Sequence, residues 1–397
     1  MTPRPRNPRS VVYATTIGFS AFALLRGQLA WLREQGWDVT LVTSPDDLAA
    51  QTAHREGVAL HGIPMERDPA PLKDLVSLAR WVGYLARARP AVVNAGTPKA
   101  GLLGTVAAWL TRVPRRVYLV HGLRLEGAHG LAARVYWLAE RLCTALATDV
   151  VAVSPSLGAE LIRRRLVSPG KLWTIGDGSS NGIDVAAVEA RIAEVDAAEL
   201  RGRLGVRPGE FVVGFVGRVT HDKGVHTLLD AFESGRLDPR VRLLIIGPKE
   251  GEGFEERIAR LGDRASWVPW TADVWGHLPA LDVLCLPTLR EGFGTVVLEA
   301  AVAGVPAITT NATGSVDTIV DGETGLLMNI GDVEALIGHI DALAADPDRV
   351  ATLGAAARDR AQEKFAQERI WAGMRDVMAG EPPAASPARR PAGVGHA

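Results

Sequence analysis

The stretch FVVGFVGRVTHDKGVHTLLDAF, residues 211–232, shows how this chain is built. It begins with an apolar run of strand length, turns through a short segment that contains Gly217 and Gly224, and ends with apolar residues at helical spacing. The strand lacks a clean alternation of apolar and polar residues, which predicts burial on both of its faces. Strands of this kind belong to parallel sheets made of β-α-β units.

The same alternation of apolar runs and helical segments repeats along the 397 residues. About five strand-like runs precede residue 155 and five or more follow residue 170: VVYATTI, VTLVTS, AVVNAG, RVYLVHG and DVVAVS, then EFVVGFVGR, VRLLIIGP, ASWVPW, DVLCLPT and GVPAITT. We therefore predict an α/β protein with two Rossmann-like, doubly wound parallel-sheet domains that face each other across a cleft. Ligands are expected in that cleft, at the carboxyl ends of the strands.

The Ser-Pro-Gly break within residues 165–173 suggests the domain boundary. The first domain is predicted at residues 1–170 and the second at residues 171–365. The Pro- and Ala-rich residues 381–397 are predicted to be a disordered tail.

Composition describes a folded protein of the cytoplasm. Hydrophobic residues make up 47% of the chain and charged residues 22%. Two cysteines, Cys143 and Cys285, provide no disulfide framework and fit a reducing compartment. No apolar run reaches the roughly 18–20 residues of a membrane span, and the N-terminus lacks a signal-peptide core. A cytoplasmic location is predicted, with any membrane contact made from that side.

The charge is unevenly distributed. Residues 1–170 hold 21 of the 44 Lys and Arg residues but only 12 of the 45 Asp and Glu residues. A basic first half predicts an anionic partner, although chance and a basic N-terminal tail explain it as well. The partner would be an anionic ligand or an anionic lipid surface. Ordinary solvation is the alternative for the cations concerned, which are Lys99, Arg112, Arg115, Arg116 and Arg124.

Two cations follow the strand of the opening stretch. Arg218 and Lys223 lie between the strand and the start of the next helix. Fixed cations and helix N–H groups together suit a diphosphate. Solvated surface residues are the alternative interpretation.

Two carboxylates occur in LREGFGTVVLEAAVAGVPAITT, residues 289–310. Glu291 lies in the loop after a strand, next to glycines that let backbone N–H groups approach a ligand. Glu299 lies in a helix that is otherwise apolar and is closed by Gly304 and Pro306. A buried carboxylate needs hydrogen-bond donors. The hydroxyls of a ribose could supply them, and a neighbouring arginine is the alternative.

These residues form a recognisable pair of motifs. E-G-F-G-x₄-E at 291–299 and V-G-R-x₄-K-G at 216–224 resemble the family 4 glycosyltransferases of the GT-B fold, especially members that build bacterial cell-surface polysaccharides. The similarity spans about residues 10–380. It includes TPKAGLLG (97–104), VHGLR (120–124), VSPS (153–156), SNGID (180–184) and GETGLL (322–327). One departure is the loop after the first strand, which offers Gly18 where many relatives have two glycines.

The resemblance implies roles for single residues. Arg218 and Lys223 would neutralise the donor diphosphate, and Glu299 would hold the ribose hydroxyls. Glu291 would contact the transferred sugar, beside which His121 would lie. Backbone N–H groups would come from the rest of the loop, which is Gly292, Phe293, Gly294 and Thr295. A helix at about 366–380 would pack back on the first domain.

The resemblance further implies a retaining glycosyltransferase. The donor would be a nucleoside diphosphate sugar, UDP-linked and carrying a hexose or N-acetylhexosamine. The acceptor would be lipid-linked or a polysaccharide precursor. The alternatives are a transferase that decorates a soluble secondary metabolite and, with less support from the motifs, a GT-B-fold sugar-nucleotide epimerase or a nucleotide-sugar-binding protein without activity. No nucleic-acid partner is expected.

One short motif imitates a metal site. Asp346-Pro347-Asp348 resembles the D-x-D that chelates a metal–nucleotide complex in other glycosyltransferases. It follows a helical segment, and proline suits the first position of a helix. We read it as a helix cap, and we expect neither a required metal nor another cofactor.

Overall fold

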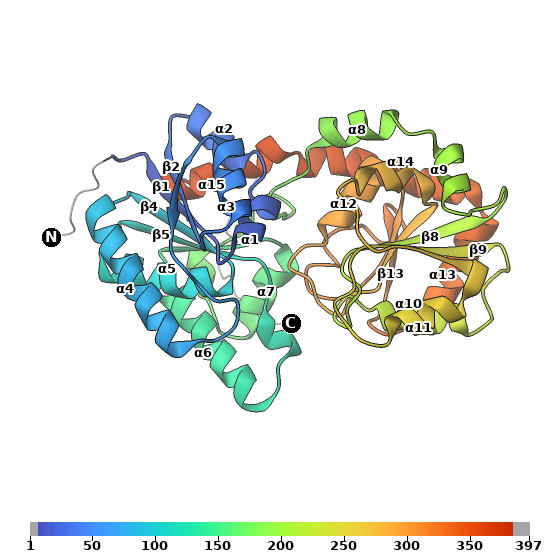
Figure 1. The fold of residues 1–397 in the computed structure, drawn as a ribbon, viewed down its shortest axis with the longest axis horizontal. Coiled ribbons are helices and arrows are strands. Elements are labelled where there is room, and N and C mark those ends of the chain that lie inside the picture. The colour runs from blue at the N-terminus through green and yellow to red at the C-terminus, as the bar shows by residue number, and fades with distance from the viewer. Residues whose placement is uncertain (1–6, 384–397) are drawn as a thin grey trace, which may run out of the picture. The chain divides into compact units, whose positions relative to one another are not determined.

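Two compact units make up the chain in the computed structural model, which describes residues 7–383. Unit 1 runs to Gly182 and resumes at Gln367, and unit 2 spans Ile183–Ala366. Each unit contains one parallel sheet with helices on its faces (Figure 1). The prediction of two doubly wound parallel-sheet domains is therefore confirmed. Residues 384–397, the main part of the predicted tail, lie outside the described residues.

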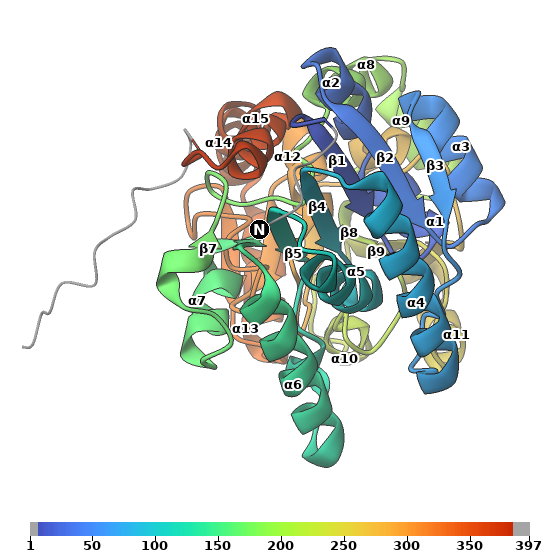
Figure 2. The same cartoon turned by 90° about the vertical axis from the view of Figure 1, so that its left-hand side faces the viewer.

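Unit 1 is built on a seven-stranded sheet of order β3-β2-β1-β4-β5-β6-β7. Its strands are β1 (Ser10–Ala14), β2 (Asp38–Thr43), β3 (Ala59–Gly62), β4 (Val92–Gly96), β5 (Arg115–Val120), β6 (Asp149–Ala152) and β7 (Leu172–Trp173). Its helices are α1 (Gly18–Leu24), α2 (Gln28–Glu34), α3 (Asp47–Glu56), α4 (Pro71–Ala88), α5 (Pro98–Leu110), α6 (Gly130–Leu146), α7 (Pro155–Arg163) and α15 (Gln367–Ala379), with 3₁₀ turns η1 (Arg124–Gly127) and η2 (Pro169–Lys171). Among them, α5 contacts both α4 and α6 (Figure 2).

Unit 2 is built on a six-stranded sheet of order β10-β9-β8-β11-β12-β13. Its strands are β8 (Phe211–Val216), β9 (Val241–Ile246), β10 (Ala265–Val268), β11 (Val283–Leu286), β12 (Ala307–Thr310) and β13 (Gly325–Met328). Its helices are α8 (Val185–Ala193), α9 (Ala197–Arg203), α10 (Val225–Glu233), α11 (Phe254–Arg260), α12 (Thr295–Val302), α13 (Val333–Ala345) and α14 (Pro347–Phe365), with 3₁₀ turns η3 (Gly262–Arg264) and η4 (Trp275–Ala280).

The first unit extends further along the chain than the Ser-Pro-Gly break suggested. β7 pairs in parallel with β6, through Val150 with Leu172 and Val151 with Trp173. The division between the units therefore falls after Gly182, later than the expected boundary at residue 170.

The end of the chain belongs to unit 1. In α15, the Trp371 indole donates a hydrogen bond of 2.7 Å to Asn181 Oδ1, and its ring lies 5.9 Å from that of Trp31. The helix also contacts β5. These contacts account for the membership of residues after Gln367 in this unit.

The central strands are mostly apolar because helices cover both faces of the sheet, and the exception in β9 is the buried Arg242, which pairs with Glu210 at 3.3 Å. In β8 every residue after Phe211 is buried, and all of β9 is buried. Full burial of each large aliphatic side chain contributes about 1.5–3 kcal/mol. The sheets therefore fix the positions of the loops that follow their strands. Cys143 and Cys285 are buried and free.

The motif that imitates a metal site caps a helix, as expected. Asp346 precedes α14, and its carboxylate accepts a 3.0 Å hydrogen bond from the N–H of Arg349. Pro347 occupies the first turn, where its missing N–H costs nothing. No helix within residues 7–383 is long and apolar enough to cross a membrane.

Replacing the cap should measurably weaken the fold. We expect Asp346→Ala to reduce the free energy of unfolding by about 1 kcal/mol, because an N–H of the first turn loses its acceptor. Asp348→Ala, two residues further, should cost less, and denaturant titration compares the two. Equal losses in both variants would contradict the capping role.

Candidate functional site

The carboxyl ends of β8 and β11 meet at the topological switch point of unit 2. The two strands are parallel neighbours, although β9 and β10 lie between them in the chain. At such a point the connections leave in opposite directions and open a crevice for ligands. The loop after β8 carries Arg218 and Lys223, and the loop after β11 carries Glu291. The structure thus brings together the predicted residues of both motifs.

A glycine allows the two loops to touch. Gly224 has φ = 71°, and a Cβ atom built on it would lie 1.7 Å from the carbonyl oxygen of Pro287. Two hydrogen bonds accepted by the carbonyl of Asp222 hold the loops in place. The Leu289 N–H donates one at 2.9 Å, and the Thr288 hydroxyl donates the other at 3.0 Å. A residue with a side chain could not replace Gly224 without separating the loops.

An ion pair spans the contact. Lys223 Nζ binds Glu291 Oε1, and the two side chains are 20% and 11% exposed. Both groups are therefore partly desolvated, which makes each dependent on the other. The lysine reaches the carboxylate from the opposite loop, and part of its side chain remains exposed.

The second cation is held more loosely. Arg218 forms a 2.6 Å ion pair with Glu250, and both side chains are more than 40% exposed. Exposed pairs contribute about 0–1 kcal/mol, so an anionic ligand can compete for the guanidinium.

The pKa of the Asp222 carboxyl reflects the charges that surround it. Burial raises the pKa of its carboxyl, yet the net shift is downward. The lowering comes from the Thr220 hydroxyl and from three nearby cations, Arg290, Arg218 and Lys223. The two predicted cations therefore act on one small region of the loop.

Glu299 accepts a hydrogen bond from a residue that the sequence analysis did not predict as its partner. It is half-buried on α12, and its Oε1 accepts a 3.0 Å hydrogen bond from the indole Nε1 of Trp275 in η4. Thr295 lies one turn earlier on the same helix and is also half-buried, so the two side chains lie on one face.

The start of α12 offers backbone donors. The cap residue is Gly294, which has no side chain to accept hydrogen bonds from the N–H groups of the first turn. The N–H groups of Gly292, Phe293 and Gly294 donate to no acceptor within residues 7–383, whereas that of Thr295 donates to the carbonyl of Phe293 at 2.9 Å. Three of the four predicted backbone donors are therefore open in this structure.

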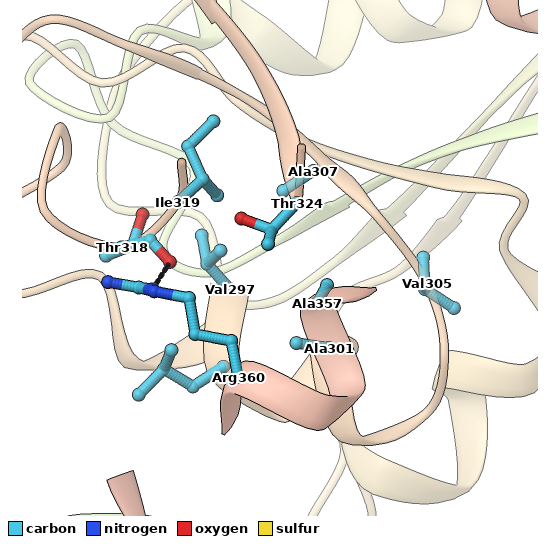
Figure 3. Close-up of a pocket in the computed structure, with 10 residues that line it drawn as sticks. Val297, Ala301, Val305, Ala307, Thr318, Ile319, Thr324, Ala357 and Arg360 are labelled. Atoms are coloured by element: carbon cyan, nitrogen blue, oxygen red, sulfur yellow. Dashed lines mark hydrogen bonds between the residues drawn. The ribbon is translucent and has the colours of Figure 1, made fainter. Parts of the chain in front are cut away.

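Side chains from α14 pack against the loop that follows β11. The Phe293 ring lies 5.6 Å from Phe365, over which the Arg360 guanidinium packs at 4.7 Å. Arg360 also donates to the carbonyl of Thr318 at 2.8 Å, as Figure 3 shows. Gly314, with φ = 77°, lies so close to the carbonyl of Gly292 that a Cβ would be 2.4 Å away.

The cavity behind α12 is too small to be a ligand site. It offers about 10 Å³, which is near the minimum for a single water molecule. Its walls come from α12, α14 and the segment around Thr318 (Figure 3). A groove of about 450 Å³ occurs in unit 1, between α4 and the segments that follow β2 and β3.

His121 belongs to unit 1, at the end of β5. Burial lowers its pKa to about 4, so the imidazole is neutral at physiological pH. Its Nδ1 has no partner within the described residues, and its Nε2 lies 2.8 Å from where Gly96 would carry a Cβ. The histidine therefore packs against the end of the neighbouring strand β4.

Two threonines at the switch point of unit 1 were not anticipated. Thr97 has φ = 66° and ψ = 145°, an unfavourable conformation for a residue with a side chain. Its hydroxyl oxygen accepts a 2.9 Å hydrogen bond from the backbone N–H of Thr16. The hydroxyl oxygens of the two threonines also lie 2.9 Å apart. This contact joins the ends of β1 and β4. The sequence did not indicate this contact, because a β-branched residue that follows a strand does not by itself predict such a pairing.

The proposed basic residues of unit 1 mostly serve the fold. Arg115 pairs with Asp149 at 2.9 Å, and Lys99 pairs with Asp74 at 2.8 Å. Arg116 donates to the carbonyls of Leu146 and Val113, each at 2.7 Å. Within residues 7–383 no cluster of three or more His, Cys, Asp or Glu could hold a metal ion.

Comparisons with known proteins agree with this architecture. Residues 23–178 match the model of the glycosyl transferase 4-like domain, and residues 196–360 match that of glycosyl transferases group 1. The capsular polysaccharide biosynthesis glycosyltransferase CapM of Staphylococcus aureus is 36% identical over 88% of this chain and 91% of that protein. The chain is a family 4 glycosyltransferase.

Two other proteins extend the comparison of this glycosyltransferase. An Escherichia coli UDP-Gal:α-D-GlcNAc-diphosphoundecaprenol α-1,3-galactosyltransferase is 27% identical over 70% of this chain and 76% of that protein. The crystal structure of Anabaena Alr3699/HepE in complex with UDP superposes with a TM-score of 0.77 and 21% identity, covering 94% of this chain and all of that one. The latter supports the GT-B fold.

The contact at Gly224 can be tested by adding one methyl group. Gly224→Ala should reduce the free energy of unfolding by roughly 3 kcal/mol or more, since it adds both backbone strain and a clash with Pro287. Gly322→Ala is a matched control because Gly322 has φ = 74° and no atom near its Cβ direction. The control should cost only about 1–2 kcal/mol. Denaturant titration of both variants would expose an error if their losses were the same.

Proposed function

We propose that this glycosyltransferase binds a UDP-linked hexose or N-acetylhexosamine at the switch point of unit 2. The observation that carries the proposal is the convergence of Arg218, Lys223 and Glu291 on two adjacent strand ends, with Glu299 on the helix that follows. Cations and open N–H groups at a helix start suit a diphosphate. The binding of UDP by Anabaena HepE supports the choice of nucleotide.

Each residue has a separate part in donor binding. Arg218 leaves its exposed partner Glu250 and, with Lys223, neutralises the diphosphate. Glu299 accepts hydrogen bonds from the ribose hydroxyls while Trp275 holds its carboxylate in place. Glu291, oriented by Lys223, accepts from hydroxyls of the transferred sugar. The N–H groups of Gly292, Phe293 and Gly294 complete the anion site.

We propose a transfer with retention of the anomeric configuration. The acceptor hydroxyl attacks the anomeric carbon on the face from which the diphosphate departs. The bond to the phosphate oxygen breaks as the bond to the acceptor oxygen forms, and the acceptor proton passes to the leaving phosphate. Fixed cations stabilise the charge that develops there, so no metal is required. His121, which is neutral, contributes a hydrogen bond beside the sugar.

The acceptor is proposed to be a lipid-linked glycan or a polysaccharide precursor. This proposal is supported by the names of two relatives, the S. aureus capsular polysaccharide enzyme and the E. coli enzyme that acts on a diphosphoundecaprenol. The excess of basic residues in the first half of the chain suits such an anionic acceptor. Cytoplasmic action follows from the use of a nucleotide sugar.

Ligand-dependent thermal stability tests the donor site. A saturating ligand at about 100 times its Kd stabilises the folded state by about 2.7 kcal/mol, so UDP and its correct sugar conjugate should raise Tm. Lys223→Ala should abolish this rise and lower kcat/KM by about 100-fold or more. The control Arg236→Ala removes a cation that pairs with Glu334 and lies between α10 and β9, so it should behave as wild type. A full UDP response in Lys223→Ala would refute the diphosphate assignment.

Because that variant leaves Glu291 without its lysine, its folding needs a check. The double variant Lys223→Met/Glu291→Gln removes both charges and should recover most of the lost stability. It should still fail to respond to UDP. Recovery of the response in this variant would show that the ion pair acts only structurally.

Product analysis tests the reaction itself. With an α-linked donor, proton NMR of the early product should show an α linkage, and excess EDTA should leave the rate unchanged. A β-linked product would exclude retention, and loss of activity restored by a divalent cation would exclude metal independence. A panel of lipid-linked and soluble acceptors, with matched glycan ends, identifies the acceptor class.

A further inference from the structure

Helix α6 has its apolar face directed away from the protein. Of its 17 residues only Glu140, Cys143 and Thr144 are buried. Exposed fractions of 44–76% occur at Leu131, Val135, Leu138 and Leu142. Their spacing of four, three and four residues places them in one stripe. The stripe lies opposite the buried Glu140, so these four apolar side chains point away from the core of unit 1.

Polar contacts fix α6 in this orientation. Glu140 accepts a 2.8 Å hydrogen bond from the buried Tyr118 hydroxyl of β5. The Trp137 indole donates to the carbonyl of Arg164 at 3.2 Å, and the Thr144 hydroxyl donates to that of Leu166. At the end of the helix, Lys171 donates to the carbonyl of Ala145 at 3.0 Å. Rotating the helix to bury its leucines would break these bonds.

Basic side chains border the stripe. Arg134 and Arg141 are exposed, and each follows a stripe leucine by three residues. The one carboxylate of α6, Glu140, is the group turned inward. Arg165 is also exposed, and its two neighbours in the chain contact α6. No carboxylate within residues 7–383 forms an ion pair with these three arginines.

The stripe lies at the functional edge of the unit 1 sheet. α6 follows β5 through η1, so its first turns stand near the carboxyl end of β5, where His121 is found. The helix extends away from the rest of the unit in both views (Figures 1 and 2). The first turns of α4, which begin at the same edge, expose Leu72, Leu75 and Val76.

We propose that the α6 stripe, with Arg134 and Arg141, docks on an anionic phospholipid surface. A helix with an outward apolar stripe and flanking arginines lies in the membrane interface, with its apolar side chains among the acyl chains and its cations at the phosphates. A stable protein partner fits less well, since a standard interface uses about 20–30 residues on each side. Four side chains on one protruding helix fall far short of that.

Docking would serve the proposed transfer by holding the carboxyl edge of unit 1 near lipid-linked acceptors. It requires neither donor nor acceptor, so it can be measured independently of that function. The cations earlier considered for a lipid surface, Lys99, Arg115 and Arg116, have partners inside unit 1. α6 takes their place as the membrane-facing element.

Vesicle flotation of the full chain tests the proposal. The wild type should float with vesicles that contain equal parts of phosphatidylcholine and phosphatidylglycerol, and less with phosphatidylcholine alone. Leu131→Glu/Leu138→Glu should reduce the bound fraction at least tenfold, since two exposed leucines lose their burial in lipid. Arg134→Gln/Arg141→Gln should weaken binding about fivefold per charge, on anionic vesicles only.

A matched variant controls for added negative charge. Val320→Glu/Ile330→Glu changes two exposed apolar residues of unit 2 and should float as the wild type does. The UDP-induced rise in Tm should be the same in all variants, which shows that the donor site is intact. Equal flotation of the wild type and Leu131→Glu/Leu138→Glu, or no flotation at all, would overturn the proposal. A concentration-dependent dimer that dissolves in this variant without any vesicle binding would assign the stripe to a second copy of the chain instead.

Discussion

The ion pair between Lys223 and Glu291 is the interaction on which the candidate site of unit 2 depends. It joins two loops that are adjacent in space because β8 and β11 are neighbours in the sheet. The pair can form only because Gly224 lets the backbone of one loop rest on Pro287 of the other. Sheet order, a glycine and a partly desolvated ion pair thus act together. Each is ineffective without the other two.

The sequence predicted the central strands well and the edges poorly. β8 is a continuous apolar run, and β9 is apolar except for Arg242, because both of their faces are covered. β3 was missed because three of its four residues are exposed, so it carries no hydrophobic signal. β7 was missed because it spans only two residues, and β13 was not anticipated as a strand although most of it is buried. Both strands pair with a neighbour that offers hydrogen-bonding groups, a cause that a single-sequence pattern does not contain.

For the site, residue types were predictable and their partners were not. The motifs named Arg218 and Glu299, but their partners Glu250 and Trp275 lie 32 and 24 residues away along the chain. Charge counts had the opposite weakness. They offered Arg115 and Lys99 as contacts for an anionic partner, whereas the fold gives both an acidic residue to pair with. Only the sheet order decides which distant residues meet.

Helical periodicity has the same limit, because it defines a face without saying what the face meets. In α10 the apolar face packs into the core, with Val225, Leu228 and Phe232 buried. In α6 an equally regular stripe points outward, and two of the three buried residues, Glu140 and Thr144, are polar. The difference arises from Tyr118 and the carbonyls near residue 165, which give the polar face of α6 its hydrogen bonds. Because the outward stripe buries no apolar surface within unit 1, we assign it to contact with the lipid surface proposed above.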